Sequence, residues 1–283
     1  MKYYQITFRF RPVSTAAKEL LPALIADCGF ESFEDQDDGV TGYVQQDQWD
    51  EEALQQVLSC FPLTDTVVTY EQQEAEDRNW NEQWEKEGFT PIVIDEALVI
   101  HDGRHLSAVP YPLSIEIDAH QAFGTGNHQT TRMIVSELRT MDLHGRRILD
   151  CGCGTGILSI AALKMGAREA VGYDIDEWSA DNARHNAVIN QVDGRFTSLL
   201  GDVTILEQVS GTFDVVLANI NRNILLADMP MFRQKMRTGA LLVLSGFYSA
   251  DIPLLEERAN ALGMKKKAQR TDDDWACMVL QLT

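Results

Sequence analysis

The first 70 residues alternate between apolar and polar positions in short blocks separated by turn-forming residues. In the first block apolar side chains recur at every second position, which predicts a strand with one buried face: Tyr4, Ile6, Phe8 and Phe10. The next block has helical spacing, with Ser14 able to cap its first turn and Gly29 able to end it. The apolar face of this predicted helix is formed by Leu20, Leu21, Leu24 and Ile25.

A hairpin signal follows at Asp37-Asp38-Gly39, because Asp-Gly favours the tight turn between two antiparallel strands. The remaining predicted elements of this region are strands at 30–34, 40–44 and 64–70 and a helix at 49–61. The order strand, helix, strand, strand, helix, strand predicts a small α+β ferredoxin-like domain over residues 1–70. That fold by itself specifies no function.

Residues 71–91 are acidic and predict a linker helix, with Trp80 and Trp84 one turn apart. We interpret these tryptophans as packing against a domain. From Ile92 the chain is rich in strand patterns, and from Thr130 helical and strand patterns alternate, which predicts a doubly wound parallel α/β sheet. This second domain is assigned to residues 92–283, and further buried strands are predicted at 239–244 and 276–282.

Composition places the chain among ordinary globular proteins. It has 283 residues, of which 45% are hydrophobic and 24% charged. No apolar run reaches the roughly 18 residues that a membrane span needs, and the N-terminus lacks the layout of a signal peptide. The odd number of cysteines, 5, indicates reduced thiols in the cytoplasm. We therefore expect a cytoplasmic protein that does not associate with a membrane.

The net charge of −19 is unevenly distributed along the chain. Residues 1–96 contain 6 Lys or Arg and 21 Asp or Glu, a formal charge of −15. One interpretation is a solvated surface, which we favour, and the other is a docking surface for a basic partner. Either interpretation argues against direct nucleic-acid binding by this part of the chain, because a phosphate backbone is itself anionic.

The strongest chemical signal is the glycine-rich run from Asp150 to Gly156, which directly follows the apolar residues 147–149. Such a turn lets the backbone approach a ligand and places a helix N-terminus, here from Ile157, beside it. Asp174 follows Gly152 by 22 residues, at the end of a second apolar run, where a carboxylate can accept hydrogen bonds from ribose hydroxyls. These features predict a site for a nucleoside-containing cofactor.

The glycine spacing distinguishes between cofactors. It is Gly-x-Gly-x-Gly, whereas the dinucleotide fingerprint requires Gly-x-Gly-x-x-Gly and fails here at Ile157. The turn resembles motif I of class I S-adenosylmethionine methyltransferases. That resemblance implies that Asp150 and the glycines line the methionine end of the cofactor, that Asp174 holds the ribose, and that Asp202 lies near the adenine. A purely structural strand–helix turn is the alternative, and we interpret Cys151 and Cys153 as packing residues, with no metal site.

A second glycine-containing loop, residues 122–131, precedes the first and ends where Thr130 or Thr131 could cap a helix. This loop, residues 148–162, residues 172–176 and residues 218–220 follow one another at the spacing of one family. The sequence resembles the bacterial methyltransferases of ribosomal large-subunit protein eleven over most of its length. The Gly-Thr-Gly-x-His-x-Thr-Thr loop is the most specific element of that resemblance.

The resemblance implies a class I methyltransferase sheet of Rossmann type, preceded by a ferredoxin-like domain that recognises the protein substrate. It implies S-adenosylmethionine as cofactor, and lysine side-chain and N-terminal amines of that ribosomal protein, before its assembly into the ribosome, as methyl acceptors. The implied cofactor-binding residues are Thr131, Gly152, Asp174, Asn219, Phe123, Gly154 and Asp202. Two segments depart from the family pattern, Asn127-His128-Gln129 and Asn221-Arg222-Asn223, and they bear on substrate selectivity.

Asn219 is the predicted catalytic residue. It ends an apolar strand, where its side-chain carbonyl could accept a hydrogen bond from the acceptor amine and aim the nitrogen lone pair; the alternative is a cap of the strand end. His128 is a weaker candidate, because a loop histidine is as often a structural hydrogen-bonding group. Lys265-Lys266-Lys267 is interpreted as a solvated face.

Three other functions compete with the favoured one. The closest is a class I N-methyltransferase that acts on RNA or on a small-molecule amine, and the absence of Pro-Pro-Tyr/Phe after Asn219 argues against a nucleobase acceptor. A binding module without catalytic activity is disfavoured by the intact glycine turn, Asp174 and Asn219. A nicotinamide-dependent dehydrogenase is disfavoured by the glycine spacing.

Overall fold

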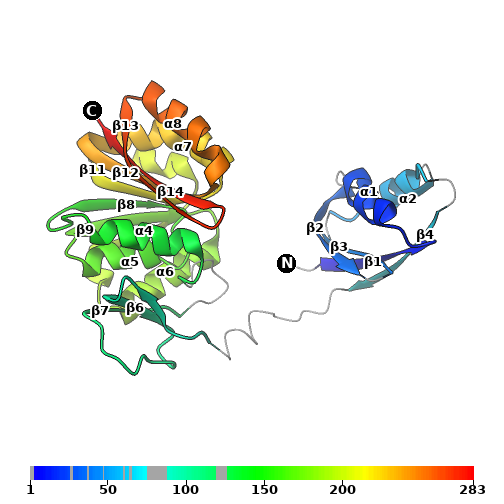
Figure 1. Cartoon of the computed structure of the whole chain (residues 1–283), viewed down its shortest axis with the longest axis horizontal. Coiled ribbons are helices and arrows are strands. Elements are labelled where there is room, and N and C mark those ends of the chain that lie inside the picture. The colour runs from blue at the N-terminus through cyan, green and yellow to red at the C-terminus, as the bar shows by residue number, and fades with distance from the viewer. Residues whose placement is uncertain are drawn as a thin grey trace. The chain divides into compact units, whose positions relative to one another are not determined.

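The chain divides into two compact units, Met1–Glu82 and Gln83–Thr283. The computed structural model (Figure 1) describes residues 3–25, 28–36, 38–46, 48–59, 61–63, 66–74, 88–118 and 126–283. Each unit has its own hydrophobic core.

The N-terminal unit has the predicted βαββαβ order. Its elements are β1 (Tyr3–Arg11), α1 (Thr15–Ile25), β2 (Phe30–Gln36), β3 (Gly39–Gln45), α2 (Glu51–Ser59) and β4 (Val67–Glu74). The sheet order is β2-β3-β1-β4 with antiparallel pairing throughout, which confirms the ferredoxin-like prediction. Ser14 caps α1 as predicted, since its Oγ accepts a hydrogen bond from the Ala17 N–H at 3.2 Å. Both helices cover one face of the sheet (Figure 1), where Phe8, Leu21 and Leu54 are fully buried.

The linker helix predicted over residues 71–91 is wrong in the parts that the structure describes. Residues 71–74 continue β4, because their backbone pairs with β1 from Thr7 to Tyr4. Sheet pairing of the backbone therefore overrides the acidic composition of an exposed edge strand. Residues 88–91 are not helical, and Trp80 and Trp84 lie outside the described residues.

The C-terminal unit is built on a seven-stranded sheet with the order β10-β9-β8-β11-β12-β14-β13. The first five strands of this order are parallel and β14 is antiparallel to both of its neighbours, which confirms the doubly wound α/β prediction. The strands are β8 (Arg147–Cys151), β9 (Glu169–Asp174), β10 (Phe196–Leu200), β11 (Phe213–Asn219), β12 (Met236–Tyr248), β13 (Met264–Asp272) and β14 (Trp275–Leu282).

Helices cover both faces of this sheet (Figure 1). One buried cluster contains residues of α4 (Gln129–Arg139), α5 (Ile157–Lys164) and α6 (Glu177–Ile189), and the other contains residues of α7 (Arg222–Lys235) and α8 (Ile252–Ala261). Short 3-10 helices lie at Asp193–Arg195, Val203–Gln208 and Ser249–Asp251. None of the helices in the described part of the chain combines the length and the apolar character needed to cross a membrane.

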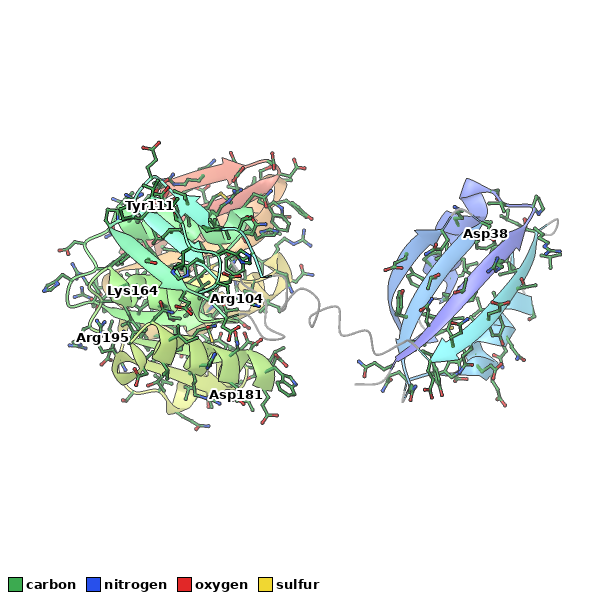
Figure 2. The ribbon with its side chains drawn as sticks, turned by 90° about the horizontal axis from the view of Figure 1, so that it is seen from below. Asp38, Arg104, Tyr111, Lys164, Asp181 and Arg195 are labelled. Atoms are coloured by element: carbon green, nitrogen blue, oxygen red, sulfur yellow. The ribbon has the colours of Figure 1, made fainter. Side chains whose placement is uncertain are left out.

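A separate three-stranded sheet packs on the α4–α5–α6 side. It consists of β5 (Ile92–Ile94), β6 (Leu98–His101) and β7 (Leu113–Glu116), in that order. Its fully buried Ile100 and Ile115 belong to the same cluster as α4 and α5. Lys164 of α5, labelled in Figure 2, donates to the Ser114 carbonyl at 2.6 Å and so joins this sheet to the seven-stranded α/β core.

The sequence pattern did not predict β13 as a strand. Its edge position explains why: six of its nine residues are exposed, including Lys265, Lys266 and Lys267, so the segment lacks the apolar alternation of a half-buried strand. Lys266 pairs with Glu256 at 2.6 Å. The interpretation of this basic run as a solvated face therefore agrees with its position.

Candidate active site

The site lies where the carboxyl ends of β8, β9, β10 and β11 meet. The strand order reverses direction between β8 and β11, and ligands of open α/β sheets bind outside the strand ends at such a point. A cavity of about 600 Å³ occupies this place. Six predicted site residues line it together, although they come from separate parts of the sequence: Thr131, Gly152, Gly154, Asp174, Asp202 and Asn219. The seventh, Phe123, lies outside the described residues.

The glycine turn is shaped by backbone conformations that favour glycine. Gly152, Gly154 and Gly156 have φ values of 69°, 50° and 78°. A Cβ on Gly152 would lie 2.5 Å from Ile220 Cγ2, and one on Gly156 would lie 3.1 Å from Ala183 Cβ. The first glycine therefore keeps the turn close to the end of β11, and the third lets α5 pack closely on α6.

Asp174 faces the glycine turn from the end of β9. Its Oδ2 accepts from the Gly154 N–H at 2.9 Å, and its Oδ1 accepts from the Asp176 N–H at 3.1 Å. Each carboxylate oxygen has two acceptor positions, so both can still accept a hydrogen bond from a ligand hydroxyl. The carboxylate thus holds the turn and offers the acceptors that a ribose diol requires.

Asp150 occupies a different position from the one that the resemblance implied. It is fully buried and does not line the cavity formed by the described residues. Its Oδ2 accepts from the Ser159 N–H at 3.1 Å and from the Ser159 hydroxyl at 2.7 Å, which fixes the first turn of α5. Burial raises the pKa of Asp150 to about 6 in spite of these two donors. Asp150 thus supports the glycine turn from behind and lies outside the described lining of the cavity.

Asn219 and Thr131 meet across the cavity wall. The Asn219 Nδ2 donates to the Thr131 hydroxyl oxygen at 3.3 Å. Its Oδ1 is buried and has no hydrogen-bond partner among the described residues. Because buried carbonyl oxygens nearly always have a partner, this oxygen marks where a polar ligand atom is expected to bind.

The cap of α4 differs from the prediction. The helix begins at Gln129, so that Thr130 and Thr131 lie inside its first turn and cannot be its N-cap. His128 is the N-cap: its Nδ1 accepts from the Thr130 N–H at 3.3 Å, and its ring packs edge-on to Trp275 at 4.8 Å. This arrangement gives His128 a structural role and leaves Thr131 directed at the cavity.

Two carboxylates face the far end of the cavity. Asp202 caps the 3-10 helix that begins at Val203, and the hydroxyl and N–H of Thr204 lower the pKa of Asp202. Asp228 of α7 lines the same cavity, and its pKa is raised by burial and by the charge of Asp202. Sequence reasoning missed Asp228. Asp228 lies four residues after Ile224, which also lines the cavity. This i, i+4 spacing was the available signal that one face of α7 borders the site.

Sequence reasoning also missed the apolar lining. Ile175, Val203 and Ile220 each directly follow one of the predicted polar residues Asp174, Asp202 and Asn219, and all three line the cavity. The side chain of Ile175 is 73% exposed in spite of its size. An apolar residue directly after a predicted polar site residue is the pattern that could have predicted this wall of the cavity.

Comparison with known proteins identifies the family. A sequence model described as "Ribosomal protein L11 methyltransferase (PrmA)" matches residues 21–283. The chain is 43% identical to the ribosomal protein L11 methyltransferase of Phocaeicola vulgatus over 278 residues, covering 98% of both proteins. The chain belongs to the ribosomal protein L11 methyltransferase family.

Two further members support this assignment. The ribosomal protein L11 methyltransferase of Porphyromonas gingivalis is 40% identical over 283 residues, covering 98% of this chain and 97% of its own. The crystal structure of the ribosomal protein L11 methylase from Lactobacillus delbrueckii subsp. bulgaricus matches with a TM-score of 0.63 at 25% identity, covering 69% of this chain and all of the other. The protein is therefore an S-adenosylmethionine-dependent methyltransferase, as the resemblance to motif I implied.

The cavity of this L11 methyltransferase family member fits S-adenosylmethionine chemically. The cofactor offers hydroxyl donors on its ribose and an amino donor on its adenine, and the cavity presents the carboxylates of Asp174, Asp202 and Asp228. Backbone at Gly152 and Gly154 has no side chain to keep a ligand away. The unpartnered Oδ1 of Asn219 adds an acceptor at the end next to Thr131.

Proposed function

We propose that this protein transfers methyl groups from S-adenosylmethionine to lysine side-chain and N-terminal amines of ribosomal protein L11, in the cytoplasm and before L11 joins the ribosome. The observation that carries the amine assignment is the buried Asn219 Oδ1, which has no partner among the described residues. A buried, unpartnered hydrogen-bond acceptor on a residue that lines the cavity suits an N–H donor, whereas a sulfonium or a methyl group offers it no conventional donor. Thr131, Gly152, Gly154, Asp174 and Asp202 are proposed to hold the cofactor.

The bound cofactor supplies a methyl group that is already activated on a sulfonium sulfur. The lysine ammonium first loses one proton to solvent; the neutral nitrogen would then form the new N–C bond as the C–S bond breaks, with the bonding electron pair passing to sulfur, and the product is a methylated ammonium. Positioning is therefore the main task of the protein.

The acceptor amine must be neutral when it attacks. A lysine with a pKa near 10.4 costs roughly 4–5 kcal/mol to deprotonate at pH 7. A cavity wall formed by Ile157, Leu158 and Ile220 disfavours the charged ammonium and lowers this cost. The Asn219 Oδ1 then accepts one N–H of the neutral amine and directs the lone pair at the methyl carbon.

The choice of substrate rests on the relatives and on charge. The most similar relatives are named for ribosomal protein L11, and the first 96 residues of this chain carry a formal charge of −15. An acidic N-terminal unit would favour encounter with a basic protein through complementary charge. We assign substrate recognition to that unit and catalysis to the unit that contains the cavity.

Intact mass spectrometry tests this function. The purified protein is incubated with S-adenosylmethionine and unmodified large-subunit ribosomal proteins, and the mass of each protein is measured. Methyl-sized mass steps on L11 alone support the proposal. Steps on another protein, on RNA or on a small amine, with none on L11, would replace the proposed substrate.

The Asn219→Ala variant tests the role of Asn219 in the same assay. We expect turnover to fall by about a hundredfold while the Kd for S-adenosylmethionine changes by less than about tenfold, because the interaction is made mainly in the transition state. Turnover equal to that of the wild type would rule out Asn219 as the orienting group.

A further inference from the structure

Three buried asparagines, two in α6 and the third at its C-cap, lie one helical turn apart on the face toward β7. Asn182, Asn186 and Asn190 are only 5%, 0% and 7% exposed. Four residues of helix rise about 6 Å, and two residues of extended chain span about 6.7 Å. Amide side chains at i, i+4 and i+8 can therefore meet every second peptide group of an extended segment that runs along the helix.

The extended segment that they meet is residues 116–118. Asn190 exchanges two hydrogen bonds with Glu116, accepting from its N–H at 3.1 Å and donating to its carbonyl at 2.6 Å. Asn186 accepts from the Asp118 N–H at 2.9 Å, and Asn182 donates to the Asp118 carbonyl at 2.8 Å. On its other side the segment pairs with β6, since the Ile117 N–H donates to the His101 carbonyl at 2.8 Å. The asparagine side chains thus replace a neighbouring strand.

Asn186 also reaches the cofactor-binding turn. Its Nδ2 donates to the Thr155 carbonyl at 3.0 Å and to the Asn182 Oδ1 at 3.0 Å. Thr155 is fully buried and lies between Gly154 and Gly156. With one accepted and two donated hydrogen bonds, Asn186 uses its amide to connect the turn, its own helix and the 116–118 segment.

We propose that Asn186 is a positioning residue for S-adenosylmethionine binding, which holds the Thr155 carbonyl and with it the conformation of the Gly152–Gly156 turn. Three glycines in left-handed conformations leave this turn with little intrinsic restraint. Orienting the Thr155 carbonyl fixes the plane of the peptide that joins Thr155 to Gly156, and therefore the exit of the turn into α5. The inference concerns cofactor binding alone and does not depend on the identity of the methyl acceptor.

The isosteric variants Asn186→Asp and Asn190→Asp form a matched pair. Each replaces the Nδ2 donor by an oxygen and keeps the acceptor. Each loses one hydrogen bond within α6 and one to a backbone carbonyl outside it, of Thr155 for Asn186 and of Glu116 for Asn190. We expect both variants to lower the Tm by similar amounts, because each loses two donated hydrogen bonds, both buried for Asn186 and one buried and one part-buried for Asn190.

Only Asn186→Asp is expected to raise the Kd for S-adenosylmethionine, by about tenfold or more, in isothermal titration calorimetry well below the Tm. The KM for the cofactor should rise with it, and kcat at saturating cofactor should change less. Hydrogen exchange of peptides that cover residues 152–156 should accelerate in Asn186→Asp and not in Asn190→Asp.

An equal change in Kd for the two variants, or an unchanged Kd in Asn186→Asp, would show that the asparagines only stabilise the fold. If an Asp variant does not fold, Asn186→Ser and Asn190→Ser are compared by the same three measurements, with the same outcomes deciding. Because the readout is cofactor binding, a failure of this proposal is distinct from a wrong substrate assignment.

Discussion

The side-chain amide of Asn219 donates to the hydroxyl oxygen of Thr131 at 3.3 Å, across 88 residues of sequence. This hydrogen bond connects the end of β11 with the first turn of α4. It holds the amide nitrogen on Thr131 and leaves the buried Asn219 Oδ1 without a partner among the described residues, on a side chain that lines the cavity. Thr131 therefore fixes the orientation of the Asn219 carbonyl oxygen, which is proposed to accept a hydrogen bond from the substrate amine.

Thr131→Val should reduce kcat by about tenfold, because valine has the shape of threonine but cannot accept the hydrogen bond from Asn219. Steady-state methylation at saturating S-adenosylmethionine measures the effect. Thr131→Ser keeps the hydroxyl and should retain most of the activity. Activity of Thr131→Val equal to that of the serine variant would contradict the orienting role.

Gly152→Ala should greatly weaken cofactor binding and destabilise the protein by about 1–3 kcal/mol. Its φ of 69° strains any residue with a Cβ, and that Cβ would lie 2.5 Å from Ile220 Cγ2. Gly194→Ala is the control, because a Cβ there meets nothing within 4 Å. Thermal unfolding and calorimetric titration with S-adenosylmethionine check both effects, and a Gly152→Ala variant that binds normally would exclude close backbone approach at this turn.

Asp174→Asn should raise the Kd for S-adenosylmethionine by about tenfold to a hundredfold. The charged carboxylate is replaced by a neutral amide, whose NH2 group must face another donor, either the Gly154 N–H or a ribose hydroxyl. The increase in Tm that the cofactor produces in the wild type should shrink accordingly. Asp181→Asn removes a carboxylate from the exposed side of α6 (Figure 2), where it pairs with Arg184, and should leave the Kd unchanged. Equal effects of the two variants would indicate a nonspecific response to charge.

Asp150 should make stability fall as the pH rises. Burial raises its pKa from 3.8 to about 6, so the folded state binds a proton more tightly than the unfolded state. This contribution is fully present below pH 3.8 and is lost as the pH rises through about 6, with a total of about 3 kcal/mol.

Asp150→Asn removes that dependence. The free energy of unfolding of the variant, minus that of the wild type, should increase between pH 4 and pH 7 in urea titrations. Other titrating groups cancel in this difference. A difference that is constant over this range would show that Asp150 titrates normally in the folded protein.

The sequence was sufficient for features that depend on local pattern. The βαββαβ order, the doubly wound sheet and the glycine turn each follow from short-range periodicity or from glycine spacing. Six predicted residues line one cavity because parallel strands bring their carboxyl ends to one edge of the sheet.

The rest depended on long-range contacts that no local pattern encodes. Asp150 is the acidic residue of the glycine-rich motif, but in the fold it lies behind the Gly152–Gly156 turn and accepts a hydrogen bond from Ser159. Asp228 becomes part of the site only because one side of α7, with Ile224 and Asp228, borders the cavity. Residues 71–74 are polar enough for a linker and still form a strand, because β1 offers a free edge to pair with.

All described residues that line the cavity lie between Thr131 and Asp228, within one of the two units. The proposed methyl-donor site, as far as the described residues form it, is thus encoded between Thr131 and Asp228. In evolutionary terms, the choice of target protein could change through the N-terminal unit while the methyl-donor site stays under unaltered selection. A chain organised in this way can acquire a new target without first losing its cofactor.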